Sequence, residues 1–376
     1  MFNIIALSLL CFLSASYASQ IINAADPKFV TPLGRAFPIS GGLGFSWLGC
    51  GLHVSHTGTV LRATVLAHPS RPFKFATYEA TQGNMPFQGI LIIPASSMNE
   101  TFVASAGGAG EVKVLINVPP DYWASGADSI VILSLESDGT FNPAPPPSPR
   151  VLHVLGDSIT AATNVRGGFP KCADEGLYAD YSSSWAGILC SFFGAKCSTV
   201  AVGGKGLVKN CCDSGTVIPQ FYTQEKKNDA DGSFDFKEDT TPPQGVLVYL
   251  GTNDYSRGGS PALDTLFTAG FLALMNNVTR SYYGTPAAPL NTTFFAILGP
   301  MSPTLPSDAM QAAVTQGIAR GYNVVFVNAT TACGPNLTGC TDGCAQHPGV
   351  ASHRNIARIV ATAVEAALGW PSPGVL

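Results

Sequence analysis

The sequence predicts an α/β protein in which a doubly wound, five-stranded parallel sheet follows a small antiparallel β-sandwich. Short β-type runs, separated by Gly, Pro and Ser clusters, fill residues 29–137 without a helical period. From residue 151 onward, continuous apolar runs alternate with helical segments, as expected for parallel strands that are buried on both faces. A proline-rich stretch at 142–149 separates the two patterns, so we expect two domains.

The N-terminal domain is predicted to span residues 27–138 as a jelly-roll-like β-sandwich. Its clearest strands are expected where aliphatic and β-branched residues concentrate, at 58–65, 89–93 and 112–118. Residues 139–149 form the expected linker. Its prolines favour polyproline II and a semi-rigid spacer, and an ordered surface loop is the alternative.

The second domain is predicted to span residues 150–376. Its strands are expected at 151–155, 198–202, 245–250, 293–298 and 324–327. Its helices are expected at 185–193, 263–283 and 353–368. With the strand order 2-1-3-4-5, the carboxyl ends of the first three strands meet at the topological switch point, where open α/β sheets bind their ligands.

Residues 1–18 are predicted to be a secretory signal peptide. An apolar run at 4–13 precedes small residues that end at Ala18, although the usual basic segment is missing. Ten cysteines occur, and Cys11 would leave with the signal peptide, so nine remain and one should stay free or bond another chain. Sequons of the form Asn-x-Ser/Thr, which predict glycosylation of an exported chain, occur at Asn99, Asn277, Asn291, Asn328 and Asn336.

The charge pattern argues against several kinds of partner. Only 12% of the residues are charged and the net charge is −4, so no basic patch suggests a nucleic-acid partner. Beyond the N-terminus, no stretch is long and apolar enough to span a membrane. The sequence contains neither a CxxC pair nor an HExxH helix, so no metal or other cofactor is expected. The oligomeric state does not follow from the sequence.

Chemically useful residues follow each of the first three predicted strands. Ser158 lies in Gly-Asp-Ser-Ile-Thr after the first strand, where a hydroxyl nucleophile would open into the crevice. The second strand leads into a glycine block at 203–206, whose N–H groups can approach an anion; a phosphate loop is the rival, but GxxxxGKS/T is absent. Asn253 follows the third strand and can donate to an oxyanion. Together these segments predict an acyl-transfer site.

His347 is the candidate general base for this site. Of the histidines, only His347 and His353 follow the last predicted strand, from which a loop can return to the crevice. Pro348 keeps the closing helix from extending back through that loop. His353 falls on or near the helix and is expected to pack against the core. Asp157 is expected to hold the nucleophile turn rather than to take part in the chemistry.

These segments resemble the successive motifs of the SGNH (GDSL-type) hydrolases. The Gly-Asp-Ser-Ile-Thr motif, the glycine block, Gly-Thr-Asn-Asp and a late His-Pro come in the order of that class and cover residue 151 to the C-terminus. Gly34-Arg35, Phe-Ser-Trp-Leu-Gly-Cys at 45–50 and the segment 203–210 are similar to the family 2 carbohydrate esterases. Those proteins are two-domain acetyl esterases with a β-sandwich ahead of the SGNH domain.

The resemblance implies a role for each candidate residue. Ser158 is the nucleophile, and His347 is the base that removes its proton and later protonates the leaving alcohol. The oxyanion hole is formed by the N–H of Ser158, the N–H of Gly204 and the side chain of Asn253. Gly203 is the fallback for Gly204, because the sequence does not fix the register within the glycine pair.

One position departs from the family pattern, which places an Asp two or three residues before the catalytic His. Ala345 and Cys344 occupy those positions, and the nearest carboxylate is Asp342, five residues before His347. A disulfide between Cys340 and Cys344 could fold the loop and deliver Asp342 as the third member of a triad. Alternatively, Asp342 is a turn residue and a backbone carbonyl orients the imidazole, as in family 2 esterases that work with a dyad.

The expected function is hydrolysis of O-acetyl or other short-chain acyl esters on a polysaccharide by a secreted carboxylic ester hydrolase, through an acyl-serine intermediate. A lipase or other carboxylesterase is the second hypothesis, although no segment looks like the apolar lid it would need. The long loop at 210–243 is rich in Asp, Lys and Ser, which favours a polar substrate. An inactive carbohydrate-binding cell-wall protein is the third hypothesis, against which the intact Ser158, Asn253 and His347 argue.

The expected compartment can be tested on protein made in its own host. We expect a secreted, disulfide-bonded glycoprotein, because the signal peptide, the cysteines and the sequons agree. Its intact mass should fall on glycosidase treatment and rise by two hydrogens for each disulfide on reduction. An intact mass that changes under neither treatment would contradict the prediction.

Overall fold

The structure is a computed structural model. It describes residues 19–39, 41–68, 73–82, 85–94, 98–104, 110–117, 129–168, 178–225, 234–236, 241–284, 291–301, 306–333, 342–345 and 347–376. The expected signal peptide, Cys340 and residues 226–233 and 237–240 of the loop at 210–243 lie outside the described residues.

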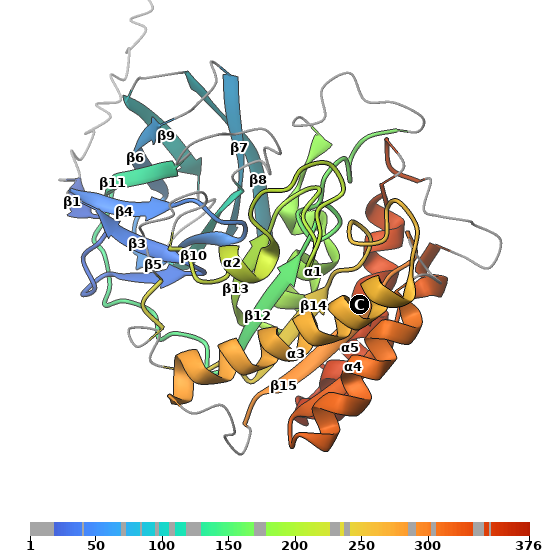
Figure 1. The fold of residues 1–376 in the computed structure, drawn as a ribbon. Helices are drawn as coiled ribbons and strands as arrows, with labels where there is room; N and C mark the ends of the chain where they lie inside the picture. The colour runs from blue at the N-terminus through green and yellow to red at the C-terminus, as the bar shows by residue number, and fades with distance from the viewer. Residues whose placement is uncertain are drawn as a thin grey trace, which may run out of the picture.

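The N-terminal domain is an antiparallel β-sandwich, as predicted (Figure 1). One sheet has the order β3-β4-β11-β6-β9, with β1 added beside β11, and the other has the order β2-β5-β10-β7-β8. The strands are β1 Gln20–Asn23, β2 Val30–Leu33, β3 Ala36–Ile39, β4 Gly42–Phe45, β5 Cys50–His56, β6 Val60–His68, β7 Phe73–Gln82, β8 Met85–Pro94, β9 Met98–Ala104, β10 Gly110–Asn117 and β11 Ser129–Ser137. The first strand therefore precedes residue 27, where the sequence suggested that the domain begins.

The segment after β11 lies along the sandwich and is held by backbone hydrogen bonds. The N–H of Asn142 donates to the carbonyl of Ser55 at 2.9 Å, and the N–H of Ala144 donates to the carbonyl of Lys28 at 2.8 Å. Phe141 is buried against the same domain. These contacts fit an ordered surface loop better than a free spacer.

The second domain contains a five-stranded parallel sheet. Its strands are β12 Val151–Gly156, β13 Lys196–Ala201, β14 Gly245–Tyr249, β15 Thr293–Leu298 and β16 Asn323–Asn328. The observed order β13-β12-β14-β15-β16 confirms the predicted 2-1-3-4-5 arrangement, and every pair is parallel. The continuous apolar runs located these strands because both faces of each central strand are buried.

Helices cover both faces of this sheet (Figure 1). They are α1 Trp185–Phe193, α2 Ile218–Phe221, α3 Pro261–Tyr283, α4 Ser307–Ala319 and α5 Val350–Leu368, with short 3₁₀ helices at Tyr181–Ser183 (η2) and Thr330–Cys333 (η3). Helices α1 and α5 pack on the face that carries Leu247. Helices α2, α3 and α4 pack on the opposite face, with Val246 and Val248. Alternate residues of β14 thus serve two separate cores.

Helix α4 was not predicted from the sequence. Its buried residues are mostly small, with Ala309, Met310 and Ala313 facing the sheet, so its apolar stripe is weak. It also contains Gly317, which a helix normally disfavours. A Cβ at Gly317 would lie 2.9 Å from Cε of Met275, so the glycine allows α4 to pack closely on α3.

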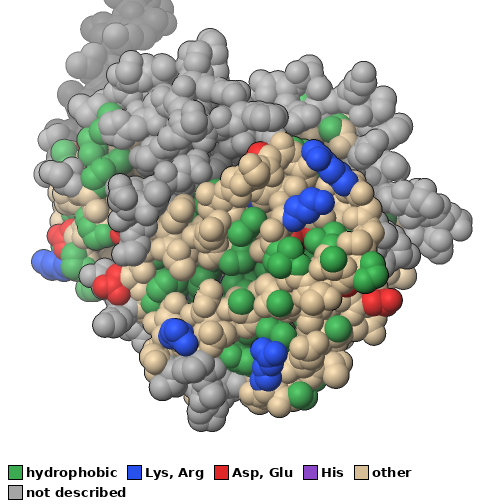
Figure 2. Space-filling view, viewed as in Figure 1, with side chains coloured by type: hydrophobic (Ala, Val, Ile, Leu, Met, Phe, Trp, Pro, Cys, Tyr) green, Lys and Arg blue, Asp and Glu red, His purple; other side chains and the backbone are tan. Residues whose placement is uncertain are grey.

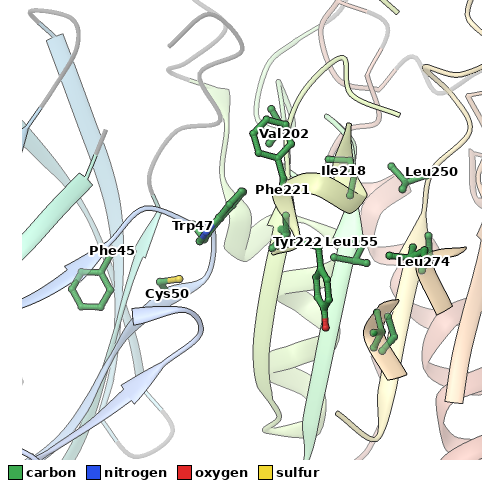
Figure 3. Close-up of a cluster of buried hydrophobic side chains, with 14 of the residues drawn as sticks. Phe45, Trp47, Cys50, Leu155, Val202, Ile218, Phe221, Tyr222, Leu250 and Leu274 are labelled. Atoms are coloured by element: carbon green, nitrogen blue, oxygen red, sulfur yellow. The ribbon is translucent and has the colours of Figure 1, made fainter. Parts of the chain in front are cut away.

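A continuous hydrophobic core joins the two domains (Figure 3). Trp47, just after β4 of the sandwich, is 1% exposed, and its ring meets Phe221 of α2 edge-on with the ring centroids 6.1 Å apart. Its Nε1–H donates to the carbonyl of Glu225 at 2.9 Å. Leu48 forms an antiparallel bridge with Thr199 of β13. The sandwich therefore packs directly on the edge of the parallel sheet.

Arg35 places a buried positive charge at the same interface. Its side chain donates from Nε to Oγ of Ser198 at 2.7 Å, and from Nη1 to the carbonyls of Tyr222 at 2.6 Å and Gln224 at 3.1 Å. The guanidinium also lies 4.2 Å from the centre of the Phe234 ring. A buried cation is tolerated only with such partners, so Arg35 fixes how the sandwich meets the second domain.

The described cysteines fit an oxidised chain with one thiol left over. The disulfide-bonded cysteines are Cys190 with Cys197, Cys211 with the adjacent Cys212, and also Cys333 and Cys344. Cys50 is free and buried, and burial raises its thiol pKa to about 12, so it stays protonated. Among the described cysteines it is the one without a disulfide partner, and it lies in the interface core.

The surface is mostly uncharged. Figure 2 shows that Lys and Arg side chains are few and spread out on the face in view, which agrees with the low charge of the sequence. Within the part of the chain that the structure describes, no helix is long and apolar enough to cross a membrane.

The interface arginine gives a stability prediction. Replacing Arg35 with Ala should lower the free energy of unfolding by roughly 2–4 kcal/mol, because buried groups of the second domain lose a charged donor. Arg62→Ala is the matched control, since Arg62 is 42% exposed and pairs with Glu136 at 3.5 Å. It should cost less than about 1 kcal/mol. Urea denaturation checks both variants, and equal losses would contradict the role assigned to Arg35.

Candidate active site

Ser158 lies in a tight turn directly after β12. Its side chain is half-buried, and the Asp157 carboxylate accepts the N–H of Ile159 at 3.0 Å, which holds the turn. Residues 157–166 form turns, and Ala162 and Asn164 have φ values of 60° and 63°. Such left-handed non-glycine residues interrupt a helix and store local strain. The serine is thus presented on a constrained turn.

His347 faces Ser158 across the site. Its Nε2 lies 2.9 Å from Oγ of Ser158, and its Nδ1 lies 3.0 Å from the carbonyl oxygen of Ala345. A carbonyl can only accept, so Nδ1 carries the proton and the Nε2 lone pair faces the serine hydroxyl. This is the tautomer that a general base needs.

Ala345 reaches His347 through an unusual backbone conformation. Its φ is +50°, in the left-handed region that residues with a Cβ seldom adopt. This conformation turns its carbonyl back toward the imidazole two residues later. This contact matches the alternative in which a backbone carbonyl orients the imidazole, but the sequence could not identify Ala345, because every residue carries the same carbonyl and only the local dihedral angles aim it.

Asp342 is directed at the start of helix α5. Its carboxylate accepts the N–H of Gly349 at 2.7 Å, and from Ser352 both the N–H at 3.0 Å and the hydroxyl at 2.7 Å. Partial burial favours a higher pKa for Asp342, but these hydrogen bonds outweigh it and hold the pKa below the ordinary value. The helix begins at Val350 after a glycine without a capping side chain, so Asp342 supplies the cap.

His353 packs in the core, as expected from its position on α5. It is fully buried, and its Nδ1 accepts the backbone N–H of Trp185 at 3.0 Å. Burial lowers its pKa to about 3, so the ring is neutral. The geometry therefore brings His347, and not His353, to Ser158.

The expected oxyanion donors meet beside the serine turn. Gly204, at φ +73°, lies in a turn closed by the N–H of Lys205 on the carbonyl of Val202 at 3.3 Å. The side-chain Nδ2 of Asn253 donates to the Lys205 carbonyl at 2.9 Å and lies 3.4 Å from Oδ2 of Asp157. Asn253 thus touches the neighbours of both Gly204 and Ser158.

The backbone N–H groups of Ser158 and Gly204 are available to an incoming oxygen. Among the described residues, neither has a hydrogen-bond partner. A buried or half-buried N–H without a partner is rare and suits a ligand contact. The primary amide of Asn253 has two hydrogens; Nδ2 donates to the Lys205 carbonyl at 2.9 Å and, over a longer 3.4 Å, to Oδ2 of Asp157.

Asp254 is a structural residue of the site that the sequence analysis did not single out. Its buried carboxylate accepts the N–H of Leu207 at 3.0 Å, of Val208 at 2.8 Å and of Lys209 at 3.0 Å. It ties the loop after β13 to the end of β14. The Gly-Thr-Asn-Asp motif contains this residue, but its role could not be predicted because the amides that it binds lie about 45 residues away in the chain.

Asp157 is fully buried beside these groups. Burial raises the pKa of its carboxyl to about 7, and the nearby charge of Asp254 adds to this rise. Its Oδ1 is committed to the Ile159 amide, in line with the expected role of holding the turn. Within the described residues, no group of three His, Cys, Asp or Glu side chains could hold a metal ion.

Comparison with known proteins agrees with this fold. No family model matches the chain. The cellulase/esterase CelE of Acetivibrio thermocellus is 28% identical over 234 residues, which cover 60% of this chain and 27% of CelE. The chain therefore spans about a quarter of the length of that relative.

Solved structures extend the likeness over both domains. A carbohydrate esterase family 2 enzyme plus carbohydrate-binding domain from Corynascus thermopiles (Myceliophthora fergusii) is 25% identical, with a TM-score of 0.70 over 91% of this chain and 100% of that one. The acetyl xylan esterase Est2A of Butyrivibrio proteoclasticus is 17% identical, with a TM-score of 0.75 over 94% of this chain and 99% of that one.

The fold is that of the two-domain SGNH hydrolases, with an antiparallel β-sandwich ahead of the parallel-sheet domain. Within that class, the chain resembles the two-domain family 2 carbohydrate esterases, as its sequence motifs suggested.

The position of Asp342 predicts the outcome of a mutation. Asp342→Asn should reduce kcat no more than about tenfold, because the Ala345 carbonyl already occupies Nδ1 and the lost interactions belong to the helix cap. The free energy of unfolding of the Asp342→Asn variant should fall by about 0.5–2 kcal/mol relative to the wild type. Ester hydrolysis and urea denaturation measure the two effects.

The reference variant is His347→Ala, which should be severely impaired. A fall of about 10⁴-fold for Asp342→Asn, the size of loss seen when the Asp of a triad is replaced by Asn, would instead make Asp342 the third triad member.

Proposed function

We propose that this protein is a secreted serine esterase that removes O-acetyl or other short-chain acyl groups from a polysaccharide or oligosaccharide. The observation that carries the proposal is the 2.9 Å contact between Nε2 of His347 and Oγ of Ser158, at the carboxyl ends of β12, β13 and β14. A base within hydrogen-bond reach of a serine hydroxyl, beside preformed N–H donors, suits acyl transfer.

The proposed reaction has two halves. In the first, Oγ of Ser158 attacks the ester carbonyl carbon while its proton moves to Nε2 of His347. The tetrahedral oxyanion accepts the N–H groups of Ser158 and Gly204 and the side-chain N–H of Asn253. The carbon–oxygen bond to the sugar then breaks, and His347 gives its proton to the departing hydroxyl. Water attacks the acyl-serine by the same route and releases the carboxylic acid.

In this proposal the imidazole is oriented by the carbonyl of Ala345. A neutral acceptor fixes the tautomer but stabilises the imidazolium less than a carboxylate does. Asp342 affects His347 only indirectly, because it caps α5, which begins three residues after His347. The working unit is thus a Ser–His dyad with a structural aspartate.

The described part of the loop after β13 is polar, and its side chains pair with one another. Nζ of Lys205 lies 2.8 Å from the Asp213 carboxylate, and Asn210 donates to the same carboxylate at 2.6 Å. Similarity to an acetyl xylan esterase and to a family 2 carbohydrate esterase supports a carbohydrate ester. These observations favour it over the lipase alternative.

Export of the protein is supported by its cysteines and sequons. Disulfide bonds persist in oxidising compartments, and the described residues contain Cys190–Cys197 and Cys211–Cys212. Three sequon asparagines, Asn277, Asn291 and Asn328, are exposed, as glycan attachment requires.

Ser158→Ala tests the function directly. The variant should keep its fold, judged by circular dichroism, and lose several orders of magnitude in turnover of p-nitrophenyl acetate, because the covalent route is removed. Ser281→Ala, a change of the same kind on α3, should leave turnover unchanged. Retention of most activity by Ser158→Ala would refute the nucleophile assignment.

Chain length of the acyl group separates the alternatives. The wild-type protein should hydrolyse p-nitrophenyl acetate faster than the octanoate and should release acetate from acetylated xylan. Faster turnover of the octanoate would favour a lipase. Inactivity on both esters, with binding to the polysaccharide, would favour a carbohydrate-binding protein.

A further inference from the structure

The adjacent cysteines Cys211 and Cys212 form a disulfide with each other, next to the candidate oxyanion loop. A disulfide between neighbouring residues closes an eight-membered ring that includes the peptide bond between them. The ring removes most of the conformational freedom of this part of the backbone. Cys212 is exposed and Cys211 is half-buried. All other described disulfide-bonded cysteines are buried, namely Cys190, Cys197, Cys333 and Cys344. The ring is therefore the described disulfide most open to a reductant.

One hydrogen bond connects this ring to the oxyanion loop. The N–H of Cys211 donates to the carbonyl oxygen of Gly204 at 3.0 Å. The next carbonyl, that of Lys205, accepts the side chain of Asn253 at 2.9 Å. Two successive carbonyls are thus held from outside the turn. Because Gly204 has no side chain to restrict its backbone, its orientation depends on such external contacts.

The loop between these points is closed at both ends. Asp254 holds the three amides of residues 207–209, which end two positions before Cys211. Asp213, immediately after the ring, binds Nζ of Lys205 at 2.8 Å and the Asn210 side chain at 2.6 Å. The disulfide ring therefore lies between two sets of contacts, the amides held by Asp254 and the Lys205–Asp213 ion pair, and connects them covalently.

We propose that the Cys211–Cys212 ring is a redox-sensitive positioning element of the oxyanion hole. In the oxidised state the ring holds the N–H of Cys211 against Gly204 and keeps the Gly204 amide aimed at the reacting carbonyl. In the reduced state the backbone dihedral angles on either side of the Cys211–Cys212 peptide are no longer restricted by the ring, and the Gly204 backbone loses this support. The inference rests on the proposed esterase function and adds a condition for full activity.

The switching chemistry is thiol–disulfide exchange. A thiolate of an external dithiol attacks the exposed sulfur of Cys212, and the sulfur of Cys211 leaves as a thiolate and takes up a proton. The second thiol of the dithiol then attacks the mixed disulfide and releases Cys212. Two electrons and two protons pass to the protein, and the dithiol ends as a cyclic disulfide.

The test is a dithiol titration of the intact protein, with alkylation and peptide mass mapping to find the dithiol concentration at which only residues 211 and 212 are reduced. At that point kcat for p-nitrophenyl acetate should fall about 10–100-fold, less than the ~10²–10³ for loss of a whole oxyanion donor. KM should stay within about twofold, because the donor acts in the transition state. Affinity for a boronic acid that forms a tetrahedral adduct with Ser158 should fall in parallel with kcat. Oxidised dithiol should restore both.

Matched variants exclude the other disulfides. Cys211→Ser with Cys212→Ser should be slow from the start and insensitive to the dithiol. Cys190→Ser with Cys197→Ser should keep the response of the wild type. An unchanged kcat with residues 211 and 212 reduced, or a dithiol response that persists in the Cys211→Ser, Cys212→Ser variant, would overturn the inference.

A readout that needs no activity separates this inference from the proposed function. Amide hydrogen exchange in residues 203–206 should accelerate on reduction of the ring, whether or not the protein hydrolyses esters. Unchanged exchange would reject the ring as a positioning element. An oxidised protein that neither hydrolyses acetate esters nor binds the boronic acid would reject the esterase proposal instead.

Discussion

The contact on which the site depends most is the carboxylate of Asp254 with three consecutive amides of the loop after β13. Hydrogen bonds to a charged group contribute about 1.5–3 kcal/mol each, so this contact outweighs the flexibility of a glycine-rich segment. Asp254 is also the direct neighbour of Asn253. The same turn therefore anchors the loop of Gly204 and aims the amide that lies beside it. Loss of this anchor would separate two strand ends that must act together.

The strands of the second domain could be predicted because burial on both faces leaves a mark in every residue, as in the run from Val151 to Leu155. The sandwich was harder. Its strands β2, β3 and β4 contain Pro32, Pro38 and two glycines, which look like turns in a sequence, although edge positions and close packing permit them. Helix α4 could not be predicted because its buried face consists mostly of alanines and a glycine, which give only a weak hydrophobic pattern.

The residues of the candidate site likewise fall into those that could be predicted from the sequence and those that could not. Ser158, Asn253 and His347 could be proposed from the sequence because side chains with special chemistry follow buried strands or precede the closing helix. A backbone carbonyl behind the imidazole could be offered as an alternative, but not that of Ala345 in particular, and the three amides held by Asp254 could not be foreseen, because backbone groups look alike in every sequence and only dihedral angles select them. The carboxylate nearest to the histidine in the chain, that of Asp342, caps a helix instead. Proximity in sequence was a poor guide there, since a five-residue loop allows many directions.

The buried guanidinium of Arg35 has a consequence for how such a chain can be rearranged by recombination. The proline-rich segment looks like a natural crossover point. However, the partners of the second domain lie more than a hundred positions earlier: Arg35 donates to the carbonyls of Tyr222 and Gln224, and Trp47 packs on the ring of Phe221. A second domain fused to a foreign partner at that segment would inherit unsatisfied carbonyls and an open apolar groove. Recombination should therefore preserve the function of the chain best when it exchanges the two domains together.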